Sequence, residues 1–268
     1  MSELNHTFVV LAYKESPYLE ECIESVLHQT VKSKVIIGTS TPCEYISNYA
    51  EKYGLEIVEN SIHGGGNAVD FDFAWNAGKT ELVTIAHQDD VYDPTYAEEV
   101  IEKYEKYPDA TIIVTDYFEI REGKRVYHNR NLDIKKMLLT PLRMTSLAHL
   151  KHVKRSALSL GNAICCPAVT FVKPNIPFDS IFVDPDNTLK GNQDWLGWLK
   201  LANSKGRFVF IPHPLMGHRV HDDTNTSWEI KAHTRSPQDL IMLKKFWPAP
   251  IAEVINKFYQ KSEDSNNV

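Results

Sequence analysis

The sequence predicts an α/β fold, a mixed and mostly parallel sheet flanked by helices, and three observations lead to it. Short apolar runs alternate with helix-like patterns over residues 1–115, as βαβ units require. The runs are apolar at consecutive positions, which is typical of strands buried on both faces. Proline or glycine stands at most of the expected helix boundaries.

Each element of the first half can be assigned in order. The residues of the first helix at positions 19, 22, 23, 26 and 27 are apolar, which places them on one helical face. Gly54 should end the second helix. Strands are expected at 7–12, 35–38, 55–58, 82–86 and 110–115, and helices at 17–27, 42–53, 67–75 and 94–107.

After residue 116 the pattern is less regular. A hairpin turn is expected at 122–124, whereas 129–160 is basic and weakly periodic, so no element is assigned there. Strands are expected at 170–172 and 207–211, and helices at 193–202, 236–247 and 251–259, before a polar tail. We therefore predict one domain over 1–235, with a nucleotide-binding half (1–115) and an acceptor half (116–235), and a C-terminal helical appendage over 236–268.

The amino-acid composition and net charge exclude some classes of function. The 268 residues are 43% hydrophobic and 24% charged, with a formal net charge of −6. This balance does not suit a nucleic-acid binder. No stretch approaches the ~20 apolar residues that span a bilayer, and the residues before the first strand do not form a signal peptide. The four cysteines form no Cys-x-x-Cys pair, so we expect a reduced, cytoplasmic chain.

The run His87-Gln88-Asp89-Asp90 follows the fourth expected strand. Ligands of open α/β sheets collect at the carboxyl ends of the strands. Carboxylates placed there can hold a hard divalent cation, which can bridge a diphosphate. The alternative is an acidic loop that caps the helix beginning at Asp93-Pro94. Spacing alone leaves both interpretations open.

Four blocks, in the same order along the chain, resemble family-2 glycosyltransferases of the GT-A fold. They are a first strand and loop with a Ser-x-x-x-Gln-Thr helix, an Asp-x-Asp-like strand end, a Glu-Asp-Trp-like segment and a His-Arg-x-His segment. In this sequence they stand at 10–30, 84–94, 193–199 and 214–221.

The resemblance implies an inverting enzyme that moves a sugar from a nucleotide-diphosphate donor to a hydroxyl acceptor. Asp194 would be the catalytic base, although by position alone it could simply cap its helix. Asp89 and His221 would hold Mn²⁺ or Mg²⁺. A zinc site built from His213, His218 and His221 is the competing idea, but their spacing matches no common pattern. The nucleotide-binding residues would be Ala12, Tyr13, Lys14, Thr39, His87, Gln88 and Asp89.

Other features bear on the substrates. Trp195 and Trp198 lie three residues apart, so one could stack on an acceptor sugar while the other packs in the core. The sequence departs from the family where Gly38-Thr39-Ser40-Thr41 replaces acidic residues, where His87 replaces the first acid, and where Gln193 precedes Asp194. These departures leave the nucleotide base open.

The expected partners are a nucleotide sugar and a glycan or lipid-linked acceptor, with a role in surface polysaccharide synthesis. The segment 240–247 could make a peripheral contact with the inner face of a membrane, although packing on the core is the simpler interpretation. Two other functions stay open, a catalytically silent sugar- or nucleotide-binding module and a nucleotidyltransferase. The latter would need a glycine-rich turn where Tyr13-Lys14-Glu15 stands.

Overall fold

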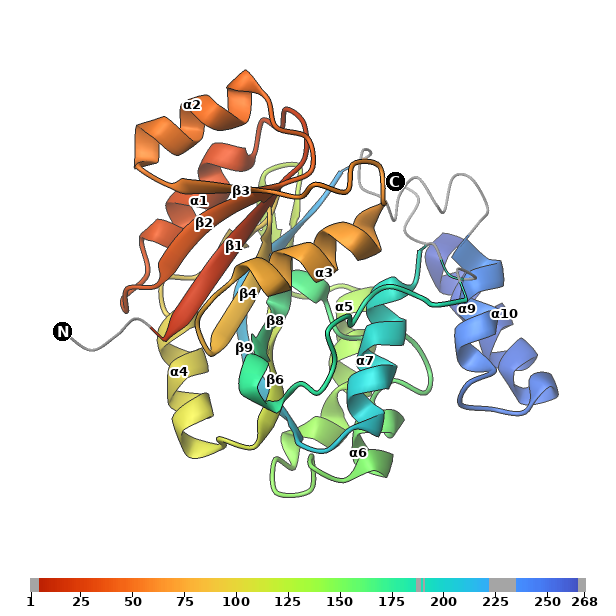
Figure 1. Cartoon of the computed structure of the whole chain (residues 1–268). Helices are drawn as coiled ribbons and strands as arrows, with labels where there is room; N and C mark the ends of the chain where they lie inside the picture. Colours follow the sequence, from red (N-terminus) through yellow and green to blue (C-terminus); the bar gives the residue numbers. More distant parts are fainter. Residues whose placement is uncertain (1–4, 187–188, 190, 222–234, 265–268) are drawn as a thin grey trace.

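The centre of the protein is a mixed sheet, seen in a computed structural model that describes residues 5–186, 189, 191–221 and 235–264 (Figure 1). Within these residues nine strands form one sheet in the order β3-β2-β1-β4-β8-β6-β9-β5, and β7 pairs with β6. The strands are β1 (His6–Ala12), β2 (Lys34–Thr39), β3 (Glu56–Glu59), β4 (Leu82–His87), β5 (Val91–Tyr92), β6 (Ala110–Arg121), β7 (Lys124–Val126), β8 (Val169–Val172) and β9 (Arg207–Val220).

Two different halves join in this sheet. Strands β3, β2, β1 and β4 are all parallel, as the alternating pattern predicted. Strand β8 then pairs antiparallel with both β4 and β6, and β6 runs parallel to β9. Since parallel strands share one carboxyl edge, the segments after β1, β2 and β4 all leave the sheet on the same side.

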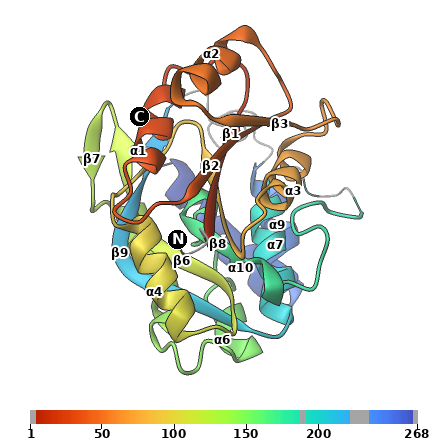
Figure 2. The ribbon, with the colours of Figure 1, turned by 60° about the vertical axis from the view of Figure 1, so that its left-hand side comes forward.

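Helices cover both faces of the sheet (Figure 2). Alternate residues of β1 explain this: Phe8 and Val10 pack with α1, α2 and α4, whereas Val9 and Leu11 belong to the cluster that includes residues of α3 and α7. The helices are α1 (Leu19–Leu27), α2 (Glu44–Tyr53), α3 (Asn67–Ala77), α4 (Tyr96–Lys106), α5 (Arg130–Leu138), α6 (Lys151–Ser156), α7 (Gln193–Asn203), α9 (Arg235–Leu243) and α10 (Ala249–Asp264). Gly54 ends α2 with φ of 64°, as predicted.

Strands β6 and β9 run well past their predicted ends at residues 115 and 211. Charged residues and prolines made the sequence look interrupted there. In the fold, Asp116 lies 3.4 Å from the Lys136 ammonium and Glu119 accepts from Arg121, so both acids are tolerated inside β6. The register between the two strands shifts beside Thr115 and Asp116, opposite the prolines of β9.

The unassigned region 129–160 contains α5, a 3₁₀ turn (Thr140–Arg143) and α6. Helix α9 ends at Leu243, earlier than predicted, and α10 is longer than predicted. Met242, Leu243 and Ala252 belong to the same apolar cluster as α7. In the part of the chain that the structure describes, no helix is both long and apolar enough to cross a bilayer.

Candidate active site

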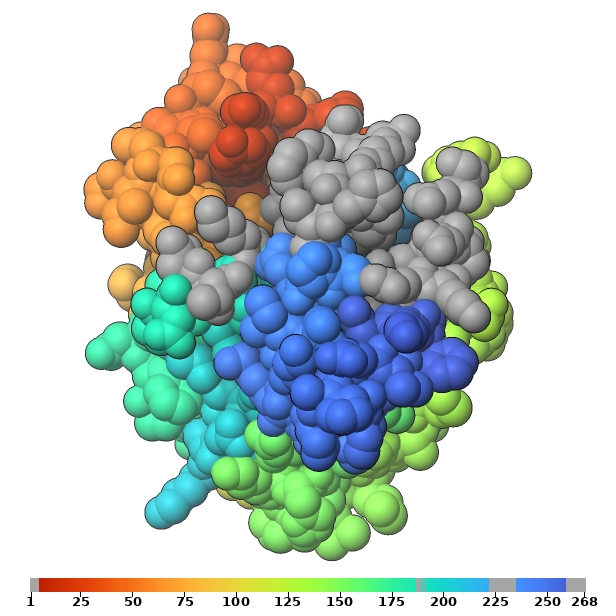
Figure 3. All heavy atoms as spheres, turned by 90° about the vertical axis from the view of Figure 1, so that its right-hand side faces the viewer, coloured from red at the N-terminus to blue at the C-terminus, as the bar shows by residue number. Residues whose placement is uncertain are grey.

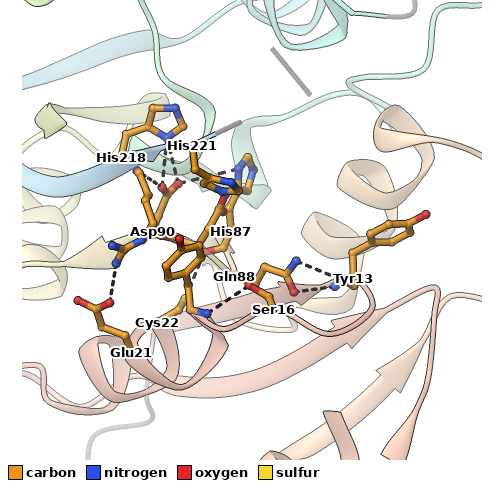
Figure 4. Close-up of polar contacts among 12 residues, drawn as sticks. Tyr13, Ser16, Glu21, Cys22, His87, Gln88, Asp90, His218 and His221 are labelled. Carbon is orange, nitrogen blue, oxygen red and sulfur yellow. Dashed lines mark hydrogen bonds and ion pairs between the residues drawn. The ribbon is translucent and has the colours of Figure 1, made fainter. Parts of the chain in front are cut away.

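The acidic turn predicted after β4 lies at the carboxyl edge of the sheet (Figure 4). The Asp90 amide donates to the His87 carbonyl at 3.1 Å, which closes the turn. Asp90 is fully buried, whereas Asp89 and His87 are partly exposed. The Cys22 thiol of α1 donates to the His87 carbonyl, so α1 supports the turn from below.

The end of β9 supplies partners that fix this turn. One Asp90 oxygen accepts from the Arg219 amide at 2.8 Å and lies 3.1 Å from His218 Nδ1. The Arg219 side chain donates to the Asp89 carbonyl and to the Glu21 carboxylate of α1. Its guanidinium also lies 4.3 Å from the centre of the Tyr18 ring. Two adjacent acids are therefore held after β4 by groups of β9, one of which also pairs with α1.

Three side chains of the turn form a group that could hold a metal ion. One ligand atom each of His87, Asp89 and Asp90 lies within 4.8 Å of the others. His221 Nε2 lies 3.0 Å from Asp89 Oδ2, about the spacing of neighbouring ligands on an ion with ligand distances near 2.1 Å. His87 Nε2 is buried and has no hydrogen-bond partner in the described residues. The carboxylates of this donor set suit Mn²⁺ or Mg²⁺, whereas its imidazole groups suit softer first-row metals, so the set can hold a divalent cation without selecting one.

The charged side chains of the turn shift one another's pKa values. Burial would raise the pKa of Asp89, but the hydrogen bond from His221 and the neighbouring histidines outweigh it and lower the pKa below its usual value. Burial would lower the pKa of His218, but the Asp90 carboxylate outweighs it and raises the pKa. Burial lowers the pKa of His87, and the nearby acids oppose this only in part. The turn thus keeps a carboxylate charge beside an unprotonated His87.

The loop after β1 is tied to the acidic turn by Gln88. Its side chain accepts from the Tyr13 amide at 2.9 Å and donates to the Tyr13 carbonyl at 3.0 Å. Lys14 has φ of 54°, and its amide donates to Thr41 Oγ1. The Tyr13 ring is half exposed and points away from Asp90 (Figure 4). The loops after β1, β2 and β4 therefore meet at one place, as the parallel topology predicted.

Two predicted nucleotide-binding residues, Ala12 and Thr39, are buried. The Thr39 hydroxyl accepts from the Thr41 amide and its carbonyl accepts from the Asn60 amide, so Thr39 shapes the turn that follows β2. Although acids are absent after β2, Asp70 of α3 binds both Ser40 and Asn60 there, at 3.0 and 2.9 Å. The Asp70 carboxylate therefore lies beside the turn after β2, where the family usually has acids of the turn itself.

Asp194 lies in the first turn of α7 and is partly exposed. One oxygen accepts from the Asn162 side chain at 2.6 Å, and the other accepts from the Trp195 amide at 2.8 Å. Its charge opposes the lowering of the His87 pKa by burial, although less than the charges of Asp90 and Asp89 do. Asp194 therefore accepts from the backbone at the start of α7, as a capping residue would, and its charge also acts on the acidic turn.

The prediction that one of two tryptophans contacts the acceptor is wrong for this structure. Trp195 and Trp198 are both fully buried. The Trp195 indole donates to the Leu158 carbonyl and stacks near Phe246, while Trp198 stacks on Phe171. Their spacing of three does reflect core packing, on a helix that is buried on more than one side.

The alternative zinc trio is not assembled. His213 is exposed and pairs with Glu99 of α4, 2.8 Å away, whereas His218 and His221 reach the acidic turn. Asn162 was not predicted, since a lone asparagine between the unassigned region and the strand expected at 170–172 carries no periodic signal. It also missed the role of Arg219, although the residue stands inside a quoted block.

The comparisons with known proteins agree with this geometry. The crystal structure of S. aureus TarS residues 1–349 has a TM-score of 0.61 with this chain, at 14% identity over 91% of this chain and 70% of that one. A mannosyltransferase from Pyrobaculum calidifontis, solved with GDP-Man and Mn²⁺, has a TM-score of 0.58 at 16% identity, covering 97% and 70%. An uncharacterised glycosyltransferase of Rickettsia typhi is 24% identical over 262 residues, 89% of this chain and 74% of its own.

The sheet and the site define a glycosyltransferase of the GT-A fold, which confirms the predicted fold class. Residues 7–169 match the glycosyl transferase family 2. The chain belongs to that family and is a transferase, as the four sequence blocks indicated.

Proposed function

We propose that the chain is an inverting, divalent-metal-dependent glycosyltransferase that uses a nucleotide-diphosphate sugar. One observation carries the proposal: Asp89 pairs with His221 beside the acidic turn, and the separate carboxylate of Asp194, on α7, is near enough for its charge to act on His87 of that turn. The mannosyltransferase neighbour was solved with GDP-Man and Mn²⁺, and TarS with UDP-GlcNAc, which supports a donor of this class.

On the donor side, Asp89 and His221 would hold Mn²⁺ or Mg²⁺, and His87 offers a further nitrogen. A bound cation offsets the negative charge that develops on the leaving diphosphate. The backbone of Ala12, Tyr13 and Lys14 and the turn after Thr39 would border the nucleotide. Gln88 fixes that border by holding both polar groups of the Tyr13 backbone.

On the acceptor side, Asp194 would take the proton of the attacking hydroxyl, which is otherwise a poor nucleophile. Asn162 and the Trp195 amide each occupy one oxygen, so the carboxylate is oriented before substrate arrives. Attack on the anomeric carbon opposite the leaving diphosphate inverts its configuration.

We further propose a cytoplasmic enzyme of surface polysaccharide synthesis, acting on a glycan or lipid-linked acceptor at the inner face of a membrane. Within the segment 240–247 the exposed lysines Lys244 and Lys245 are available for such a contact, whereas Met242 and Leu243 are fully buried and Phe246 and Trp247 are half-buried.

The test is donor turnover in vitro. UDP- and GDP-sugars are screened with and without Mn²⁺, and release of the nucleoside diphosphate is measured for the wild type, Asp194→Asn and the surface control Asp179→Asn. We expect Asp194→Asn to lower kcat by about 10²–10⁴-fold while the donor still raises Tm. Wild-type turnover in Asp194→Asn would exclude Asp194 as the base.

A further inference from the structure

Positive charge is concentrated in one part of this acidic protein. Between residues 124 and 155 the sequence has nine Lys or Arg and one Asp, whereas the whole chain carries −6. Some of these cations are used internally: Lys154 is buried against three carbonyls and Lys136 pairs with Asp116. Lys151 of α6 is exposed, and none of the ion pairs in the described residues involves it.

A cavity of about 480 Å³ lies where α6 meets the turn between α9 and α10. It is lined by basic, small polar and aromatic side chains: Lys151, His152, Arg155, Ser156, Ser159, Phe246 and Trp247. The Arg155 guanidinium lies 4.9 Å from the centre of the Phe246 ring and donates to the Lys245 carbonyl. These contacts fix one wall of the cavity. With no carboxylate in its lining, the cavity favours an anionic group.

Helix α10 presents apolar side chains outward beside this cavity. Ala252 and Asn256 are buried and face the protein. Ile251, Val254 and Phe258, spaced along one helical face, are 46%, 54% and 70% exposed. A soluble helix normally turns such a face toward its core, so this face is built for contact with something outside the described chain.

The basic and apolar features share one side of the molecule. Figure 3 shows the blue C-terminal helices resting on the green segment that contains α6. Lys244 and Lys245, between α9 and α10, are exposed at the same junction. We call the set of Lys151, Lys244, Lys245, Ile251, Val254 and Phe258 the basic–apolar face.

We propose that the basic–apolar face docks the enzyme on an anionic lipid bilayer, with α10 lying in the plane of the interface. Apolar side chains flanked by lysines suit the boundary between acyl chains and anionic headgroups. A second copy of this chain is less suitable, because a two-fold contact would set the same positive charges against each other. The inference rests on the proposed function in one respect, that the acceptor is carried by a membrane.

The experiment is co-sedimentation of the full chain with vesicles of phosphatidylcholine, with and without phosphatidylglycerol. We expect binding to the anionic vesicles only, weakened by salt. Lys151→Gln and Lys245→Gln should each lower the partition coefficient about fivefold, and Val254→Ser with Phe258→Ser should abolish binding. Val31→Ser and Lys32→Gln, which make the same changes at an exposed site between α1 and β2, should bind as the wild type does.

Equal binding to neutral vesicles, or no binding to either kind, would overturn the proposal. So would a concentration-dependent dimer that Phe258→Ser dissolves, because the face would then be an interface between copies. Donor hydrolysis is measured on the same variants without vesicles and should be unchanged. Loss of vesicle binding with intact hydrolysis, or the reverse, separates this inference from the proposed function.

Discussion

The two carboxylate sites of this enzyme are built in different ways. Asp89 and Asp90 follow the buried strand β4, and Arg219 of β9 donates to both of them and to Glu21 of α1. Asp194 begins a helix and depends on Asn162 from a loop. The residues just before it are held by α9. The proposed donor side is thus held by the sheet, whereas the proposed acceptor side is positioned by tertiary contacts between segments far apart in sequence.

The largest predicted loss of stability comes from removing a buried acid of the turn after β4. Asp90→Ala leaves the Arg219 amide and the His218 ring without their buried acceptor, so we expect the free energy of unfolding to fall by about 3–5 kcal/mol. Tm should also stop responding to Mn²⁺. Denaturant melts with and without the ion measure both effects.

Asp93→Ala is the matched control for that change, three residues along the same segment. Among the described residues the Asp93 carboxylate accepts from the amide and hydroxyl of Thr95, so this variant should lose about 1 kcal/mol and keep the Mn²⁺ response. Similar losses in the two variants would mean that Asp90 has no special place in the turn.

The second prediction tests the acceptor side. The Asn192 side chain donates to Asp239 of α9 at 2.7 Å, and the Gly191 amide donates to Gln238 at 2.6 Å. Since Asn192 immediately precedes α7, Asn192→Ala should misplace Asp194 and lower kcat by about 10–100-fold. KM for the donor should stay unchanged, because Asn192 precedes the helix of Asp194 and not the turn of Asp89.

Asn203→Ala, at the other end of α7, is the control, since the Asn203 side chain accepts an exposed hydrogen bond from Arg155. It should keep wild-type kcat. If Asn192→Ala lowers Tm but leaves kcat intact, the C-terminal helices stabilise the fold without positioning Asp194.

The same contrast explains what the sequence could predict. The parallel half follows from local patterns, because strands such as β1 are apolar throughout and proline or glycine marks the helix boundaries. Most predicted ends there lie within a few residues of the observed ones. The acidic turn and His221 were also predictable, since both stand in sequence blocks that resemble the family.

The acceptor half was harder to predict for physical reasons. Asp116 and Glu119 lie inside β6 because Lys136 and Arg121 compensate their charge, and no local pattern reveals such pairing. Asn162 matters only because the fold brings it to Asp194. The spacing of Trp195 and Trp198 suggested that one of them could stack on an acceptor sugar. The helix that carries them is covered by α6 and by the turn between α9 and α10.

The smallest predicted effect is on the pH dependence of stability, and it follows from comparing two histidines at opposite ends of the sheet. Near the carboxyl end, His218 has a raised pKa because Asp90 outweighs burial. At the amino end of β1, His6 is fully buried between the hydroxyls of Ser33 and Thr84, and burial lowers its pKa to about 3.

Because the folded pKa of His6 lies below its unfolded value of about 6.5, the unfolded chain binds the extra proton. The stability contributed by neutral His6 is complete above pH 6.5 and is lost as the pH falls toward 3, at about 1.4 kcal/mol per pH unit. His6→Gln should flatten the fall in unfolding free energy between pH 6 and 4 by that amount, in denaturant melts. His28→Gln, at an exposed position on the end of α1, should keep the wild-type slope, and parallel curves for His6→Gln and the wild type would show that His6 is already protonated in the folded protein.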